Sequence, residues 1–403
     1  MTPLPSGLHL RTAGPADLDQ ISALLTDRGD AADAVDHRLV VEDSDAGWEC
    51  CAVVVDGDRV VSTATLLDET LLLNDVSIPA GQIELVATDR EYEGRGCVRA
   101  LVDWAHRRSA ARGQLVGVML GIPYFYRLFG YQYAVPIRPS RAVASVPATP
   151  EELTVRPAVA GDIPAMAALE DAAQRGFDLS MPHSPMCWRA LVARDGSTQL
   201  VVERDDRVVA TGRLAWLSDG EAALGEVASA DVAGAHALLA WSVQRVGREK
   251  LTVQERPGSL AGDALDGFLA PVGDGDLSCY YVRVPDVAAL LTHLAPALST
   301  RLRGAGLEEP PGELIVSFFR EHVRLPYVDG EVGAAIPGGR MQAPGAAGGA
   351  GVAPDMIAPL LFGPYGIEGL AQRQPDVYPG PQRRLMSALF PPVRADLLTF
   401  YVP

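Results

Sequence analysis

The sequence predicts a mixed α/β (α+β) protein that is built from three successive domains. Its 403 residues are too many for one ordinary hydrophobic core. A strand–turn–helix pattern near the start recurs later in the chain, and an α+β pattern follows the second copy. We therefore expect two related α/β domains at residues 1–148 and 149–284, the second degenerate, and a small α+β domain at residues 285–403.

The composition limits the possible partners. The formal net charge is −17. An acidic protein repels nucleic acid and anionic membranes and concentrates cationic small molecules, although solubility alone explains such a charge equally well. The first residues lack the segments of a secretory signal, and no apolar run could span a bilayer. Five scattered cysteines show no paired spacing. We expect a cytoplasmic protein without disulfides, metal, nucleic-acid partner or membrane partner.

The repeat is visible in two short segments. Residues 8–18 read LHLRTAGPADL and residues 153–163 read LTVRPAVAGDI, so Arg, Ala and Asp recur at identical spacing. Each copy predicts a strand, a turn and the start of a helix. Aligning Glu84 with Glu226 and Trp104 with Trp241 makes the second copy shorter, and the missing piece contains Gly94 and Gly96. Only the first copy keeps this glycine-containing loop.

The glycine-containing loop has the features of an anion site. A predicted strand, QIELVAT, precedes it, and a helix from Cys97 to about Gly113 follows it. Glycines let a ligand approach the backbone, and the helix start offers free N–H groups and a positive dipole end to a diphosphate. Neither a Gly-x-Gly-x-x-Gly nor a Gly-Lys-Ser/Thr motif is present, so dinucleotide and nucleoside-triphosphate loops fit poorly. A tight turn remains the simpler alternative.

Two further stretches complete the pattern. A second predicted strand, QLVGVML, leads into the aromatic cluster GIPYFYRLFGYQYA. In the last domain, a helix is predicted from about Asp286, and GELIVSFFREHVRLPYVDGEV alternates as an antiparallel pair would. The Gly/Ala/Pro-rich stretch from Gly333 to Pro354 predicts a surface loop.

The segments LHLRTAGPADL, IELVATDREYEGRGCVRALVDW and YFYRLFGY, in this order, resemble the GNAT superfamily of acyl-CoA-dependent N-acyltransferases. The whole length is similar to the enhanced intracellular survival (Eis) family of actinobacterial acetyltransferases, with tandem GNAT domains and a sterol-carrier-protein-like C-terminal domain. The resemblance implies acetyl-CoA as cosubstrate, no metal, and a homo-oligomer such as a hexamer. It implies a general-acid role for Tyr126. The implied cofactor-binding residues are Val86, Thr88, Glu93, Gly94, Arg95, Gly96, Cys97 and Val98.

The sequence departs from the resembled pattern at two positions. GNAT loops commonly carry a basic or glutamine residue where this chain has Glu93, and a carboxylate that faces a diphosphate is unfavourable. Family members tend to end in an aromatic residue whose carboxylate reaches the active site, whereas this chain continues beyond Phe400 and Tyr401 to Pro403. The apolar end predicts a docked segment.

The general base has two candidates, the Glu84 side chain and the α-carboxylate of Pro403. A structural role for Glu84 is equally compatible with the sequence, because Glu226 matches it in the degenerate copy. Two hypotheses for the function follow. One is an acetyl-CoA-dependent N-acetyltransferase that acts on a primary amine of a cationic, aminoglycoside-like or polyamine-like small molecule by direct attack on the thioester. The other is a GNAT-like protein without this activity, which binds a ligand or performs another step of secondary metabolism. The expected acceptor-side residues are Asp36, His37, Trp48 and Leu85.

Overall fold

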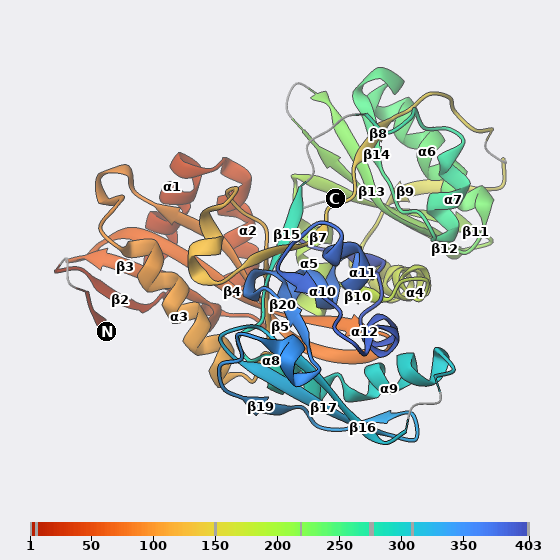
Figure 1. Cartoon of the computed structure of the whole chain (residues 1–403). Coiled ribbons are helices and arrows are strands. Elements are labelled where there is room, and N and C mark those ends of the chain that lie inside the picture. Colours follow the sequence, from red (N-terminus) through yellow and green to blue (C-terminus); the bar gives the residue numbers. More distant parts are fainter. Residues whose placement is uncertain are drawn as a thin grey trace.

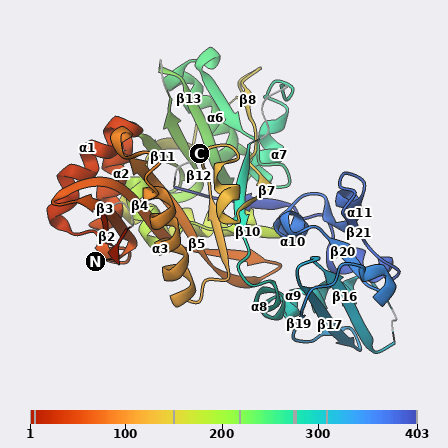
Figure 2. The same cartoon turned by 60° about the vertical axis from the view of Figure 1, so that its left-hand side comes forward.

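The computed structural model describes residues 2–4, 7–148, 151–217, 220–273, 278–307 and 310–400 (Figure 1). The chain forms three β-sheets with helices packed on them, so the predicted α/β (α+β) class is confirmed. Figures 1 and 2 show the first copy in red and orange, the second in green and the last part in blue, arranged around a common junction. No helix in these ranges is long and apolar enough to cross a membrane.

The first sheet runs in the order β1-β2-β3-β4-β5-β6-β15-β7. Alternate residues of β3 enter different cores, because a strand points successive side chains to opposite faces. Cys51, Val53 and Val55 pack in one cluster with α1 and α2 residues, whereas Ala52 and Val54 pack with the α3 residue Leu101. The elements are β1 (Thr2–Pro3), β2 (His9–Thr12), α1 (Leu18–Arg28), α2 (Ala31–Val41), β3 (Cys51–Asp56), β4 (Arg59–Leu73), β5 (Val76–Thr88), α3 (Cys97–Ala111), β6 (Val116–Met119), β7 (Gln132–Pro136) and β15 (Cys279–Arg283).

Strands β5 and β6 separate and open a cleft in the first sheet. They pair in parallel from Ala80 with Val116 to Gln82 with Val118, and β5 then continues alone on that side to Thr88. A bulge lies at the point of separation, where Leu85 takes a positive φ of 51°. Because a bulge bends its strand, it turns the end of β5 away from β6.

The second sheet repeats this design in the order β8-β14-β13-β12-β11-β9. Strand β13 pairs in parallel with β14 and carries a bulge at Glu226, whose φ is also 51°. The backbone therefore aligns Glu226 with Leu85, one residue away from the alignment with Glu84 that the sequence suggests. The elements are β8 (Ser140–Ala142), β9 (Thr154–Pro157), α4 (Ile163–Gln174), α5 (Pro185–Ala193), β11 (Ser197–Arg204), β12 (Arg207–Trp216), β13 (Ala222–Ser229), α6 (Val232–Val246), β14 (Leu251–Gln254) and α7 (Leu260–Asp266).

The two sheets exchange strands. Strand β15, at the end of the second segment, lies between β6 and β7 of the first sheet, while β8, which follows β7 in the chain, pairs with β14 of the second sheet. The predicted division into residues 1–148, 149–284 and 285–403 therefore describes segments of the sequence. It does not separate the sheets, because strands of one segment pair in the sheet of another. Strand β10 (Leu179–Met181) also joins β4 to β22 (Ala395–Leu397).

The third sheet runs β18-β17-β16-β20-β21, with β19 paired to β17. The Gly333–Pro354 stretch, predicted as a surface loop, instead contains two strands, and Ala350 and Val352 are buried. Glycine permits this packing, because a Cβ at Gly351 would lie 2.4 Å from the Tyr378 ring. The elements are α8 (Val287–His293), α9 (Ala295–Gly304), β16 (Gly312–Ser317), β17 (His322–Val328), β18 (Glu331–Val332), β19 (Ile336–Gly338), β20 (Ala350–Val352), α10 (Ile357–Phe362), α11 (Gly366–Ala371), β21 (Val377–Tyr378) and α12 (Arg383–Leu389).

Candidate active site

Two neighbouring cavities open where β5 separates from β6. The larger, of about 620 Å³, lies between the end of β5 and the start of α3. The smaller, of about 330 Å³, lies between β5 and the end of α1. We call them the loop cavity and the acceptor cavity. The residues that line both are Arg28, Val86, Ala87, Ile122 and Tyr126.

The loop between β5 and α3 leaves the helix start open. Gly94 and Gly96 have φ of 73° and 83°, which favours glycine, and a Cβ at either would meet nothing within 4 Å. Gly96 is the N-cap residue of α3 and provides no side-chain cap. The first N–H groups of this helix therefore lack a capping partner and, with the helix dipole, form a site for an anion.

The structure places all of the predicted cofactor residues except Arg95 in the wall of the loop cavity. Arg95 is not part of the cavity wall, because its guanidinium lies over the Tyr92 ring at 4.6 Å. Arg28 and Arg99 bring positive charge to the wall instead. No local pattern points to Arg28, which lies far from the loop in the chain, whereas Arg99 is in the predicted helix. The predicted residues that line the loop cavity are Val86, Thr88, Glu93, Gly94, Gly96, Cys97 and Val98.

Glu93 does not face the loop cavity as an unpaired charge. Its Oε1 atom lies 2.5 Å from a guanidinium nitrogen of Arg28, the last residue of α1. The ion pair joins α1 to the loop across the boundary of the two cavities, since Arg28 lines both. The negative charge that the sequence places in the loop is thereby compensated within the protein.

Glu84 lies in the wall of the acceptor cavity. Its carboxylate is buried and accepts a hydrogen bond from the Gln82 amide. Burial raises the pKa of Glu84 to about 8, although the Gln82 hydrogen bond lowers it, and the nearby charge of Asp33 raises it further. A carboxyl group with this pKa can exchange a proton with an amine near neutral pH, which is the property required of a general base.

Tyr126 lies at the junction of the two cavities. It belongs to a short 3₁₀ helix, Phe125–Phe129, and is 5% exposed. Burial, and to a lesser extent the charge of Glu84, raises the pKa of Tyr126 to about 12, so its hydroxyl keeps its proton at neutral pH. Its ring packs against the backbone of Gly121, where a Cβ would lie 2.3 Å from the ring. A glycine at this position therefore fixes where the hydroxyl lies.

Of the predicted acceptor-side residues, only Leu85 lines the acceptor cavity. Asp36 is buried in an ion pair with Arg194 at 2.9 Å. His37 is fully buried against Cys51, and burial lowers its pKa to about 4. Trp48 packs edge-on against His37. These three side chains lie behind the wall.

Asp33, one turn earlier in α2 than Asp36 and His37, lines the acceptor cavity instead. The carboxylate in this wall thus comes from α2, but the phase of the helix brings Asp33 rather than Asp36 to the cavity. Burial and the charge of Asp30 raise the pKa of Asp33.

The end of the described chain docks behind this wall, as predicted. Phe400 is 3% exposed and belongs to the same apolar cluster as Leu25, Leu85 and Ala87, which line the acceptor cavity. Its carbonyl oxygen accepts hydrogen bonds from Arg194 at 2.8 Å and Arg213 at 3.0 Å. Pro403, the alternative base, lies outside the described residues.

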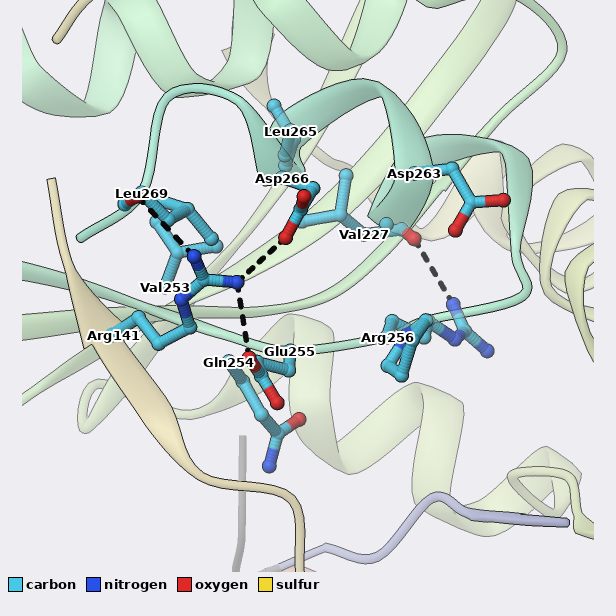
Figure 3. Close-up of a pocket in the computed structure, with 12 residues that line it drawn as sticks. Arg141, Val227, Val253, Gln254, Glu255, Arg256, Asp263, Leu265, Asp266 and Leu269 are labelled. Carbon is cyan, nitrogen blue, oxygen red and sulfur yellow. Dashed lines mark hydrogen bonds and ion pairs between the residues drawn. The ribbon is translucent and has the colours of Figure 1, made fainter. Parts of the chain in front are cut away.

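The corresponding place in the second copy, between the ends of β13 and β14, is filled by the protein itself (Figure 3). Only about 50 Å³ remains there. The Arg256 guanidinium donates to the Val227 carbonyl oxygen at 3.1 Å, at the position that matches Val86. The Asp231 side chain caps α6 by accepting from the Gly234 N–H at 2.9 Å. The helix start that is open in α3 is thus occupied by a carboxylate in α6.

Arg141 closes the other side of this filled space. Figure 3 shows its guanidinium pointing toward two acidic side chains, Asp266 at 2.7 Å and Glu255 at 3.0 Å. It also donates to the Leu269 carbonyl oxygen. Because β8, which carries Arg141, is an exchanged strand, the strand exchange itself helps to fill the second cleft.

Comparisons with known proteins agree with this geometry. A family model described as an acetyltransferase (GNAT) domain matches residues 11–134. No curated protein matches the chain. Solved structures match nearly all of it. A GCN5-related N-acetyltransferase from Anabaena variabilis ATCC 29413 has a TM-score of 0.68 at 14% identity, with 97% of this chain and 99% of that chain covered.

Two further structures are similar over the same length. A GCN5-related N-acetyltransferase from Kribbella flavida has a TM-score of 0.66 at 18% identity, with 98% of both chains covered. Eis1 from Mycobacterium abscessus has a TM-score of 0.61 at 14% identity, with 97% of this chain and 99% of that chain covered. Residues 11–134 therefore match the model of an acetyltransferase (GNAT) domain, and the chain along nearly its whole length has the fold of these proteins, consistent with tandem GNAT-type domains.

Proposed function

We propose that this protein is an acetyl-CoA-dependent N-acetyltransferase whose acceptor is a primary amine of a cationic small molecule, of the aminoglycoside or polyamine type. The observation that carries the proposal is the meeting of the two cavities at Tyr126. One cavity leads to an open helix start, and the other leads to the buried carboxyl group of Glu84. A phosphorylated thioester and an amine would reach the same tyrosine from opposite sides.

The residues of the loop cavity fit acetyl-CoA. The open start of α3 and the side chains of Arg28 and Arg99 suit a diphosphate. Beyond Gln82, β5 has no partner strand among the described residues on the β6 side, so its backbone can pair with an amide-containing arm. When bound, this cosubstrate would supply an acyl thioester as the electrophile.

Glu84 and Tyr126 then have complementary proton-transfer roles. A cationic acceptor lowers the pKa of a nearby carboxyl group, so its arrival beside Glu84 would ionise the base that must take its proton. Neutralising the amine makes its lone pair available for attack. Tyr126 holds a proton at the cavity junction and can donate it to a leaving thiolate, whose unperturbed pKa of about 8.5 is below that of the tyrosine.

The carboxyl groups of the acceptor side favour a cationic acceptor. Asp33 and Glu84 both line the acceptor cavity, and both have raised pKa values. Burial is the main cause of both raised values, and an ammonium group bound between the two carboxyl groups would favour their charged forms. The alternative, a GNAT-like protein without acetyltransferase activity that binds a ligand or performs another step of secondary metabolism, was suggested by Glu93 and by the residues beyond Tyr401. The ion pair with Arg28 offsets the charge of Glu93 in the free protein and so weakens the first of these two reasons.

The remaining expectations are part of the same proposal. The helix-covered sheet from β16 to β21 would be the sterol-carrier-protein-like domain, and the chain would assemble as a homo-oligomer. The function is tested by following thiol release from acetyl-CoA with spermidine and with an aminoglycoside as acceptors. Acceptor-dependent thiol release that falls in Glu84→Gln and Tyr126→Phe is expected. If wild-type protein binds acetyl-CoA in a calorimetric titration but neither variant changes turnover, the mechanism is wrong, and if no CoA binds, the function is wrong.

A further inference from the structure

The Arg28–Glu93 ion pair lies in the wall of the loop cavity, and its arginine also lines the acceptor cavity. Arg28 ends α1, and Glu93 begins the loop that leads to the open start of α3. Among the described residues that line the loop cavity, Glu93 is the only carboxylate. It lies within a few residues of the N–H groups that suit an anion, so any anion bound there meets its charge.

This ion pair contributes little to holding the fold together. The two side chains retain 26% and 55% of their exposure, and pairs that are this exposed stabilise proteins by roughly 0–1 kcal/mol. A weak pair of this kind can exchange partners when a stronger anion arrives. A diphosphate carries more charge than a carboxylate and accepts bidentate hydrogen bonds from a guanidinium.

Arg28 also connects the two cavities through its neighbour in the chain. Gly29, the C-cap residue of α1, lies so close to Asp33 that a Cβ there would be 1.9 Å from an Asp33 carboxylate oxygen. Asp33 and Gly29 both line the acceptor cavity. The residue next to Arg28 in the chain therefore forms part of the acceptor wall.

We propose that Arg28 is an anion-binding residue of the cofactor site, and that Glu93 keeps the Arg28 guanidinium paired until CoA binds. In the free protein the guanidinium is paired with Glu93. On binding, the diphosphate of CoA takes over the guanidinium, and Glu93 is released to solvent. Glu93 therefore lowers the affinity for CoA by competing for Arg28. The inference rests on the proposed function, because it needs CoA in the loop cavity.

A neighbouring ion pair provides the matched control. Arg90 lies 3.8 Å from Asp27, and this pair joins the same end of α1 to the 3₁₀ turn Arg90–Tyr92 just before Glu93. Neither residue lines the loop or acceptor cavity. Removing either charge changes the net charge of the same region without touching the proposed site.

The test is a calorimetric measurement of the Kd for CoA and for pantetheine, which lacks the phosphates. Glu93→Gln is expected to tighten CoA binding about threefold, as loss of a surface ionic competitor should. Arg28→Gln is expected to weaken CoA binding about tenfold or more in the wild-type background, and by a larger factor in the Glu93→Gln background, where nothing competes for the guanidinium. Pantetheine binding should change little in either variant, and Asp27→Asn and Arg90→Gln should leave the Kd for CoA within about twofold.

Comparing Arg28→Gln in the wild-type and in the Glu93→Gln background distinguishes a direct contact between Arg28 and CoA from simple neutralisation of the Glu93 charge. If Arg28 only cancels the charge of Glu93, then Arg28→Gln has no effect once Glu93 is glutamine, and that outcome would overturn the inference. Equal loss of pantetheine and CoA affinity would also overturn it, because the phosphates would not be involved. Absence of CoA binding in the wild-type protein would instead reject the proposed function. Matched thermal unfolding curves show that each variant is folded.

Discussion

The Arg213 guanidinium donates a hydrogen bond to the Phe400 carbonyl oxygen over 3.0 Å. Arg213 is only 1% exposed, lies on β12 of the second copy and also donates to the Thr399 carbonyl oxygen at 3.2 Å. Its charge is balanced by Glu226 at 2.8 Å, the residue at the bulge that matches Leu85. Although burial raises the pKa of Glu226, Arg213 and His183 hold it below its usual range. The ion pair at the bulge of the second copy thus holds Thr399 and Phe400 behind the acceptor cavity.

Replacing Arg213 should lower the free energy of unfolding. Arg213→Met leaves the Glu226 carboxylate buried without this partner and removes the hydrogen bonds that Arg213 donates to the Thr399 and Phe400 carbonyl oxygens, so we expect a loss of about 3–5 kcal/mol in unfolding free energy. The measurement is chemical denaturation. Arg207→Met, an exposed arginine on the same strand, should change the unfolding free energy by less than about 0.5 kcal/mol. A similar small effect for both would show that the segment is not held in this way.

The activity should depend on pH through Glu84. Its raised pKa keeps the carboxyl group protonated, and inactive as a base, below about pH 8, so kcat/KM should rise with pH and level off above that value. Glu84→Gln should lose this rise and about 10²–10⁴-fold in rate, the usual contribution of a general base. The exposed Glu221→Gln variant should keep the wild-type profile. An unchanged profile in Glu84→Gln would remove Glu84 from this role.

The position of the Tyr126 hydroxyl should depend on Gly121. Gly121→Ala places a methyl group 2.3 Å from the ring and must displace it. We expect Gly121→Ala to lower kcat about as much as Tyr126→Phe, and the double variant to lose no more than the single ones, because both changes remove one contribution. Gly161→Ala, where a Cβ meets nothing within 4 Å, is the control. Additive losses would mean that Gly121 acts on something other than the hydroxyl.

The sequence predicted the repeat and the open loop because local spacing encodes them. Leu18 to Leu25 and the glycines at 94 and 96 have signatures within a few residues, and the structure forms α1 and the loop there. The alignment of Trp104 with Trp241 was wrong. Helices α3 and α6 start at Cys97 and Val232, which places Trp104 opposite Leu239. Apolar identity alone does not fix helical register.

The remaining features depend on contacts between segments that are distant in the chain. The exchange of β8 and β15 leaves no local mark, because an exchanged strand has the same pattern as one that stays in its own sheet. The partnership of Arg28 with Glu93 joins residues of two separate elements, and nothing in the sequence near either one predicts it. The choice of Asp33 over Asp36 depends on where α2 begins, at Ala31, and helix starts are the least certain part of a sequence-based prediction.

The most direct test of the account is the stoichiometry of acetyl-CoA binding, measured by calorimetric titration of the whole chain. The first copy has an open helix start and a cavity of about 620 Å³, whereas Asp231 caps the matching helix in the second copy and Arg256 occupies its cleft. We predict one equivalent of acetyl-CoA per chain. Binding should weaken strongly in Gly96→Val, because a β-branched side chain is strained at a φ of 83° and disturbs the helix start. Two equivalents, or none, or one that is unaffected by Gly96→Val, would contradict the assignment of the loop cavity as the cofactor site.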